Sequence, residues 1–266
     1  MTNRVVIVTG ASEGIGAALA RTLAKKGTRL ALAARSISKL EGVAAECKDL
    51  GAEALAVRTD VGDEDACRDL IETTVEHYGQ LDALINNAGV SMSTSFESLE
   101  NLRILETLMR VNYLGAAYCT YHALPHLRRS RGMVVAVSSL QGKTGFPRST
   151  GYAASKHAVQ GFFDSLRMEL TDVGVLVVSP GAVDTEIHAR KLDPRGDVSV
   201  SGQDFRRKKQ MSPEECARRI VDAMEARKRE LVLTAGGKLA VALKPFAPGF
   251  VDTRIARAVR DFYEST

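Results

Sequence analysis

The stretch Thr9-Gly-Ala-Ser-Glu-Gly-Ile-Gly16 follows the apolar, β-branched run Arg4-Val-Val-Ile-Val-Thr9 and opens directly into a segment of helical period. Glycines at Gly10, Gly14 and Gly16 permit a tight turn, close approach of the backbone to a pyrophosphate and close packing of the helix on the strand. The free amides at the start of such a helix attract an anion. A glycine-rich turn can be only a turn, but its place between strand and helix predicts a nucleotide-binding loop.

Short apolar runs recur along the chain, separated by longer segments of helical period. Apolar runs that are unbroken rather than alternating are typical of parallel strands buried on both faces of a sheet. We expect strands near residues 4–9, 29–34, 53–58, 82–86, 132–137, 174–179 and 230–233. We expect helices over residues 15–26, 98–110, 113–129 and 151–172. This order predicts an α/β fold with a doubly wound, seven-stranded parallel sheet between two helical layers, which binds ligands beyond the carboxyl ends of its strands.

Length and composition favour a single domain over residues 1–266. The net charge of +4 and the absence of Trp give no indication of nucleic acid binding. The four cysteines, at positions 47, 67, 119 and 216, form neither a CxxC pair nor a metal-type spacing with histidines, which indicates free thiols, no metal site and a reducing compartment. Because the N-terminus lacks the pattern of a signal peptide, we expect a cytoplasmic protein.

The end of the second expected strand bears on the choice of coenzyme. NAD-binding proteins usually carry Asp or Glu about twenty residues after the glycine turn, where it binds the ribose 2′-hydroxyl. Here Ala34 supplies no carboxylate, and the guanidinium of Arg35 suits a 2′-phosphate, which favours NADP(H) over NAD(H). Glu13 argues the other way, because its charge can lie near the same phosphate. Arg35 can also be a solvated surface side chain.

Two further strand ends lie where an adenosine would rest. Asp60 follows the third strand and can accept a hydrogen bond from the adenine amine. It can equally lie just before the next helix, for which Asp63 is the more obvious cap. Asn86 and Asn87 end the fourth strand at the same place, and the alternative to a coenzyme contact is that their amides merely tie strand ends together.

A candidate catalytic group follows the fifth strand. Tyr152 and Lys156 lie four residues apart in an expected helix, on one face, and Ser139 ends the strand before it. A nearby ammonium and a positive nicotinamide ring would favour the phenolate and lower the pKa of Tyr152, which makes it a plausible acid or base. Ser139 can hold the same carbonyl oxygen. A Tyr and a Lys at this spacing also occur by chance, but the glycine turn and the strand endings make chance a poor explanation.

These motifs together resemble the short-chain dehydrogenase/reductase family, over roughly residues 4–235. The resemblance rests on Thr9–Gly16, Asn86–Gly89, Asn112, Ser139, Tyr152–Lys156 and Ser179–Gly181. It implies a Rossmann fold, a homodimer or homotetramer, and a catalytic tetrad. In that tetrad Tyr152 exchanges the proton, Ser139 orients the substrate, Lys156 binds ribose and Asn112 holds a relay water. From the motifs and the resemblance together, the expected coenzyme contacts are Gly10, Ser12, Glu13, Gly14, Ile15, Gly16, Arg35, Ser36, Asp60, Val61, Asn87, Ala88, Gly89, Tyr152, Lys156, Pro180, Gly181, Val183 and Thr185.

Within that family, three segments resemble the branch that contains 11β-hydroxysteroid dehydrogenase and the dehydrogenase/reductase member 7 proteins. They are Ala33–Ser36, Ser138–Lys143 and Gly151–Ala158. Members of that branch mostly use NADP(H), and its eukaryotic members typically carry a membrane-anchoring N-terminal helix, which this sequence does not show. The resemblance also implies a lid over the substrate, at residues 184–211.

The expected lid and the C-terminal extension, about residues 236–266, leave alternatives open. In the lid, Ile187, Val198, Val200 and Phe205 lie among many charges, and specificity would reside there. Its basic run 206–209 can meet an acidic or phosphorylated substrate, but a solvated loop is favoured. The extension is apolar and then basic, so it can cover the substrate entrance, pack in a dimer or touch a membrane surface, of which packing is favoured.

The sequence thus predicts an NADP(H)-dependent oxidoreductase that moves a hydride between nicotinamide and a carbonyl or secondary alcohol. Its expected substrate is a small, lipophilic ketone or aldehyde. One alternative is a protein without catalysis that binds NADP(H) on the same fold as a sensor or scaffold. The complete set of Ser139, Tyr152 and Lys156 argues against it. Another is a reductase of an imine or a sugar-nucleotide, which no residue excludes.

Overall fold

The computed structural model describes residues 1–185, 190–196, 198–200 and 210–264. Its main sheet has seven parallel strands in the order β10-β7-β6-β4-β1-β2-β3. Their bounds are β1 Val5–Thr9, β2 Arg29–Ala34, β3 Glu53–Arg58, β4 Ala83–Asn86, β6 Met133–Val137, β7 Gly174–Ser179 and β10 Glu230–Val232. The chain winds outward from β1 in both directions, so the predicted Rossmann fold is confirmed.

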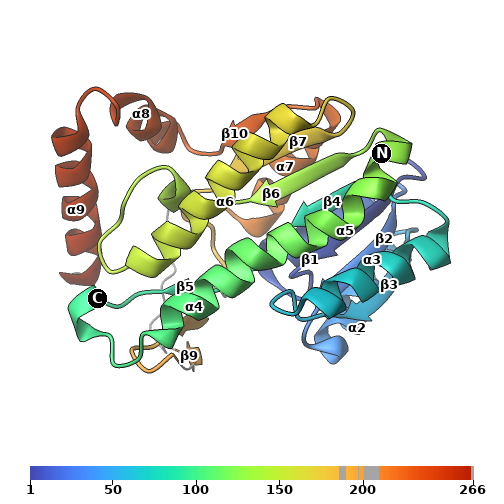
Figure 1. The fold of residues 1–266 in the computed structure, drawn as a ribbon, viewed down its shortest axis with the longest axis horizontal. Helices are drawn as coiled ribbons and strands as arrows, with labels where there is room; N and C mark the ends of the chain where they lie inside the picture. The colour runs from blue at the N-terminus through green and yellow to red at the C-terminus, as the bar shows by residue number, and fades with distance from the viewer. Residues whose placement is uncertain (186–189, 197, 201–209, 265–266) are drawn as a thin grey trace.

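Both faces of the sheet are covered by helices, as Figure 1 shows. Along β1, Val6 and Val8 pack with helices on one face, and Val5 and Ile7 pack with helices on the other. The first face carries α1 Gly14–Ala24, α2 Ile37–Asp49 and α7 Pro213–Glu225, and the second carries α3 Glu64–Tyr78, α5 Gly115–Ser130 and α6 Thr150–Glu169. Burial of each such side chain contributes about 1.5–3 kcal/mol, which explains why the strands read as unbroken apolar runs.

The two helices expected over 98–110 and 113–129 are one continuous helical run, so the predicted break between them is wrong. The run consists of α4 Arg103–Met109, a π-helical turn Arg110–Leu114, and α5. Residues 103–114 contain neither Gly nor Pro, so nothing between the two expected helices ends a helix, and the extra residue is absorbed as a wider turn. This turn carries Asn112. The helix expected over 151–172 ends earlier, at Glu169.

A second, small sheet was not expected from the sequence. It joins β5 Ser91–Met92 to β8 Arg190–Leu192 in parallel and β8 to β9 Val198–Val200 in antiparallel. The expected lid, residues 184–211, therefore contains two short strands. Ile187, Phe205 and the basic run 206–209 lie outside the described residues.

The expected C-terminal extension forms two helices, α8 Ala235–Leu243 and α9 Pro248–Glu264. They project from one end of the molecule, at the left of Figure 1. Phe246 and Phe250 are 87% and 62% exposed, while Val251 is buried. Among the residues described, no helix has the length and apolar character needed to cross a bilayer.

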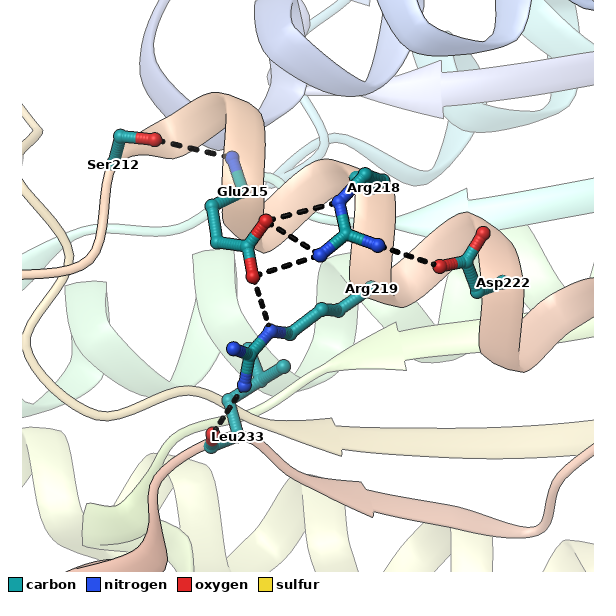
Figure 2. Close-up of polar contacts among 6 residues, drawn as sticks. All are labelled: Ser212, Glu215, Arg218, Arg219, Asp222 and Leu233. Atoms are coloured by element: carbon teal, nitrogen blue, oxygen red, sulfur yellow. Dashed lines mark hydrogen bonds and ion pairs between the residues drawn. The ribbon is translucent and has the colours of Figure 1, made fainter.

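A polar cluster at the start of α7 ties that helix to the end of β10, as Figure 2 shows. The Ser212 hydroxyl caps the helix by accepting from the Glu215 amide at 3.1 Å. The Glu215 carboxylate accepts from Arg218 and, at 2.6 Å, from Arg219 Nε. Arg219 Nη1 then donates to the carbonyl of Leu233 at 3.1 Å. Leu233, the residue that follows β10, is thereby fixed from α7.

All four cysteines are buried and free. Burial raises the pKa of the Cys47 thiol to about 11 and that of Cys216 to about 12. The pKa of Cys119 is raised well above its ordinary value by a hydrogen bond with Cys67 and by burial. In the described part of the chain, no group of three or more His, Cys, Asp or Glu side chains is arranged to hold a metal ion.

Candidate active site

The glycine turn after β1 has the conformation that its glycines were expected to allow. Gly10 and Gly14 adopt positive φ angles of 64° and 56°. A Cβ on Gly16 would collide with the Gly10 carbonyl oxygen and lie 2.7 Å from Asn87 Nδ2. Glu13, at the N-cap of α1, makes no side-chain hydrogen bond to the first turn of the helix. The amides of that turn thus face the space beyond the sheet without a side-chain cap.

Thr9 and Asn87 join the glycine turn to the end of β4. The Asn87 amide nitrogen Nδ2 donates to the Thr9 carbonyl at 2.9 Å and to the Gly10 carbonyl at 3.3 Å. The Thr9 hydroxyl accepts from the backbone amides of Asn87 and Ala88, each at 3.0 Å. Asn86 instead reaches Thr120 on α5 at 2.9 Å. Both asparagines therefore tie elements together, and the role of Thr9 is one that the sequence reasoning missed.

The remaining residues expected near the pyrophosphate and the ribose lie around the same turn. Ser12 is half-buried, and Ile15 packs against the core beneath the turn. Arg35 and Ser36 are exposed directly after β2. The Glu13 carboxylate forms an ion pair with Lys39 Nζ at 3.0 Å. The Lys39 ammonium of α2 therefore offsets the negative charge of Glu13, which by itself would disfavour a 2′-phosphate nearby.

At the adenosine side, Asp60 and Val61 follow β3. The Asp60 carboxylate accepts from the Gly62 amide at 2.9 Å and is exposed. Asp63, and not Asp60, caps α3, by accepting from the Asp65 amide at 3.0 Å. Val61 is buried, and its carbonyl lies 2.7 Å from a Cβ built on Gly115 of α5. Asp60 is thus left outside the helix cap, with its carboxylate at the edge of the sheet.

Asn112 is buried within the π-helical turn, where its side chain holds three groups. Its Oδ1 accepts from the Val90 amide at 2.8 Å, and its Nδ2 donates to the Val90 carbonyl at 3.0 Å. The same nitrogen donates to Ser155 Oγ at 2.9 Å, and Ser155 donates to the Tyr152 carbonyl at 2.8 Å. Asn112 therefore links the loop after β4 to α6. Neither Ser155 nor Val90 was picked out by the sequence reasoning.

Ser139, Tyr152 and Lys156 come together as expected. Lys156 Nζ lies 5.8 Å from the centroid of the Tyr152 ring and donates to the Val137 carbonyl at 2.9 Å. A Cβ on Gly89 would lie 3.6 Å from that nitrogen and 3.1 Å from Asn112 Oδ1. All four expected tetrad residues thus lie around one point at the carboxyl ends of β4 and β6. Tyr152 also borders an apolar cluster whose other buried members are Met92, Ile104, Leu108 and Leu192.

The pKa values of this group differ from expectation. Burial raises the pKa of Tyr152 to about 12, while a hydrogen bond with the Ser139 side chain acts in the opposite direction. In the polypeptide alone burial thus outweighs that hydrogen bond, and the lowering of the Tyr152 pKa expected from the ammonium and a nicotinamide ring together stays a prediction. Burial also lowers the pKa of Lys156 to about 8, because an ammonium is costly to remove from water.

The segment after β7 lies beside the residue that follows Ser139. Pro180 accepts a hydrogen bond from the Leu140 amide at 2.9 Å. Gly181 lies against Thr234, and Val183 is buried. The Thr185 side chain lies 3.3 Å from a Cβ built on Gly14, so this segment returns to the glycine turn. The segment thus contacts both the residue that follows Ser139 and the glycine turn.

These features fit a nicotinamide dinucleotide. The positive φ angles at Gly10 and Gly14 and the uncapped start of α1 suit a pyrophosphate. Lys156 and Tyr152 lie where the nicotinamide riboside would extend, between the ends of β4 and β6. The donors that would hold the ribose are the Lys156 ammonium and the Tyr152 hydroxyl.

Comparisons with known proteins decide the family. Residues 4–195 match the family model described as short chain dehydrogenase. The chain belongs to this family. A curated relative, 11-beta-hydroxysteroid dehydrogenase A of Arachis hypogaea, is 41% identical over 209 residues, which are 77% of this chain and 60% of that relative. The chain thus spans about three fifths of the relative's length. The predicted resemblance to that branch of the short-chain dehydrogenases is confirmed.

Solved structures agree on the fold. An alcohol dehydrogenase from the archaeon Thermococcus sibiricus, complexed with 5-hydroxy-NADP, has a TM-score of 0.77 at 29% identity and covers 86% of this chain and 95% of its own. A short-chain dehydrogenase/reductase from Burkholderia phymatum, in complex with NAD, has a TM-score of 0.83 at 24% identity, with 94% and 95% covered. This second likeness supports the fold alone.

Proposed function

We propose that this short-chain dehydrogenase is an NADP(H)-dependent oxidoreductase that reduces a lipophilic ketone or aldehyde, and oxidises the corresponding alcohol in reverse. The observation that carries the proposal is the convergence of Ser139, Tyr152 and Lys156 at the carboxyl ends of the central strands. The apolar cluster beside Tyr152 supports a lipophilic substrate. The names of the curated relative and of the solved alcohol dehydrogenase support carbinol and carbonyl chemistry.

The chemistry divides between coenzyme and polypeptide. When bound, the coenzyme supplies or accepts the hydride. Tyr152 keeps its proton at neutral pH, because its pKa is about 12, so its hydroxyl can donate to a carbonyl oxygen that gains negative charge. Ser139 donates a second hydrogen bond to that oxygen and fixes the carbonyl. The Lys156 ammonium stabilises the phenolate that remains after the proton has left, and Asn112 keeps the loop after β4 against α6.

Preference for NADP(H) over NAD(H) is also part of the proposal. It is supported by Arg35 directly after β2, by the lack of a carboxylate at Ala34, and by the ion pair that offsets the charge of Glu13. The adenine is proposed to contact Asp60 and Val61. The nicotinamide side is proposed to contact Gly181, Val183 and Thr185.

The test replaces Tyr152 with Phe, which removes only the hydroxyl. Reduction of a panel of ketones and aldehydes is followed by NADPH absorbance, and coenzyme binding by NADPH fluorescence. We expect Tyr152→Phe to lose turnover by a factor of about 10² or more while NADPH still binds, since proton transfer typically contributes about 10²–10⁴-fold. The matched control is Tyr121→Phe, because Tyr121 lies exposed on α5, and it should keep full turnover.

Two results would contradict the proposal. Unchanged turnover in Tyr152→Phe would remove the assigned acid. NADPH binding by the wild type without turnover of any panel member would favour the alternative of a non-catalytic NADP(H) sensor.

We further propose one cytoplasmic catalytic domain that assembles as a homodimer or homotetramer, with α8 and α9 packed within the assembly rather than on a membrane. The four buried thiols support a reducing compartment.

A further inference from the structure

Leu140 directly follows Ser139, and its side chain sits between two glycines that come from distant parts of the chain. A Cβ on Gly237, in the first turn of α8, would lie 2.6 Å and 2.8 Å from the two Leu140 methyl carbons. A Cβ on Gly181, in the segment after β7, would lie 3.4 Å from one of them. Any larger residue at Gly237 would thus occupy the place of Leu140. We call this arrangement the Leu140 slot, formed by Gly181 and Gly237.

The wall of the Leu140 slot that belongs to α8 is held rigidly. Thr234 caps α8, because its hydroxyl accepts from the Gly237 amide at 3.1 Å. A Cβ on Gly181 would lie 2.9 Å from the Thr234 methyl carbon, so Thr234 also contacts the segment after β7. The preceding residue, Leu233, is fixed by Arg219 from α7, as Figure 2 shows. The cap, the glycine contact and the arginine together leave the first turn of α8 little freedom to shift.

The other side of the Leu140 slot leads directly to the serine. The Leu140 amide donates to the Pro180 carbonyl at 2.9 Å, which anchors the backbone immediately after Ser139. The next amide, that of Gln141, donates to Ser139 Oγ at 3.1 Å and so sets the direction of the hydroxyl. Any displacement of Leu140 therefore shifts the hydrogen bond that orients Ser139.

We propose that the first turn of α8 positions Ser139, with Gly237 and Leu140 as positioning residues of the reaction. This inference rests on the proposed function, since Ser139 is taken there to hold the carbonyl oxygen. The family match ends at residue 195, so it does not cover the α8 wall of the Leu140 slot. The C-terminal extension is in this view a part of the catalytic geometry and not an appendage to it.

The experiment compares Gly237→Ala with Gly236→Ala. The two glycines are neighbours in the first turn of α8, but a Cβ on Gly236 meets no atom within 4 Å, which makes it a matched control. In Gly237→Ala the new methyl displaces Leu140. We expect kcat for carbonyl reduction to fall about tenfold or more, because small misplacements near reacting groups are costly, while NADPH affinity is unchanged. Gly236→Ala should retain the kcat of the wild type.

A second-site variant tests the cause of the loss. Leu140→Ala removes the side chain with which the new methyl collides, so adding it to Gly237→Ala should raise kcat to the level of Leu140→Ala alone. Such non-additivity is the mark of a direct contact. A loss that is merely additive in the double variant would contradict the slot.

Hydrogen exchange supplies a readout that does not depend on turnover. We expect the amides of Leu140 and Gln141 to exchange faster in Gly237→Ala than in Gly236→Ala, because the bonds to Pro180 and to Ser139 are weakened. Equal exchange and equal kcat in the two alanine variants would overturn the inference. An inactive wild type would instead overturn the proposed function, and the exchange rates would still decide whether α8 positions Ser139.

Discussion

The charge of Lys156 has two opposing effects, because it can stabilise a phenolate nearby but is costly to bury. The residue is 4% exposed, and its ammonium donates to the Val137 carbonyl and lies near the Tyr152 ring. Burial lowers the pKa of Lys156 and raises that of Tyr152. The Lys156 charge, which would stabilise a phenolate at Tyr152, therefore lowers the stability of the folded chain because it is buried.

This cost predicts a pH-dependent stability. Below pH about 8 the folded and unfolded chains both carry the Lys156 ammonium, so the fold bears its full burial cost. Between about 8 and the ordinary pKa of 10.5 the unfolded chain binds more protons, so the free energy of unfolding rises with pH. Across that window the wild type should gain on the order of 3 kcal/mol relative to Lys156→Met, measured by urea unfolding.

The control for this titration is Lys48→Met, because Lys48 is exposed at the end of α2. Its difference from the wild type should stay constant over the same window. A constant difference for Lys156→Met as well would mean that the Lys156 ammonium is no more buried than a surface lysine.

Arg35 decides the proposed choice of coenzyme at the scale of a single residue. If its guanidinium binds the 2′-phosphate, Arg35→Ala should weaken NADPH binding by about 1.5–3 kcal/mol, the range for hydrogen bonds to charged groups, and leave NADH binding nearly unchanged. Fluorescence titration with both coenzymes measures the difference. The control is Lys48→Ala, an exposed basic residue in α2, which should leave the binding of both coenzymes unchanged. Equal losses for NADPH and NADH in Arg35→Ala would reject the phosphate contact.

At the scale of elements, the sequence predicted the main sheet well. The five inner strands are β-branched or apolar runs buried on both faces, so their signal is local and strong, while the edge strands β3 and β10 are only partly buried. The small sheet had no such signal, because β5 has two residues and its partner β8 lies about a hundred residues later. The π-helical turn at Asn112 was missed for a related reason. Within it Asn112 holds Val90 and Ser155, and such tertiary contacts leave no periodic trace in the sequence.

The candidate site follows the same division. Ser139, Tyr152, Lys156 and the glycine turn were picked out because their residue types and spacing suit the chemistry, whereas Asn112 came from the family resemblance alone. The raised pKa of Tyr152 and the Leu140 slot were not, since burial and contacts between residues 140, 181 and 237 exist only in the folded chain. Half of the expected lid, residues 186–189, 197 and 201–209, lies outside the described residues.

Two glycine-to-alanine substitutions, one in α1 and one in α6, are expected to change the stability of the fold in opposite directions. In α1, Gly16→Ala places a methyl against the backbone of Gly10 and should destabilise the fold by about 1–3 kcal/mol. In α6, Gly161→Ala meets nothing within 4 Å and should stabilise it by about 0.5–1 kcal/mol, because alanine loses less entropy in a helix. Thermal unfolding of both variants measures this. A stable Gly16→Ala would mean that α1 can move away from the turn.

At the scale of the whole molecule, α8 and α9 form one projecting end (Figure 1). Two aromatic side chains of this end are exposed. Phe246 and Phe250 leave apolar surface that a monomer would expose to water, while the Lys244 and Asp252 side chains form an ion pair between the two helices. In the proposed assembly this surface is covered by protein.

The proposed assembly predicts that the full-length chain sediments as a dimer or tetramer and does not float with anionic liposomes. Phe246→Ser with Phe250→Ser should weaken self-association, whereas Tyr121→Ser, at an exposed site on α5, serves as the control. Flotation of the full-length chain, lost in a chain that ends at residue 236, would instead assign the extension to a membrane surface.

The sequestered cysteines have a practical consequence. Thiolates, rather than thiols, react with maleimides and iodoacetamides, and each of Cys47, Cys119 and Cys216 is both enclosed and reluctant to ionise. The native chain therefore presents no reactive thiol at its surface. A single cysteine introduced at position 236 or 246 would accept a fluorophore or spin label selectively, so that movements of the C-terminal helices could be followed without first removing any native residue.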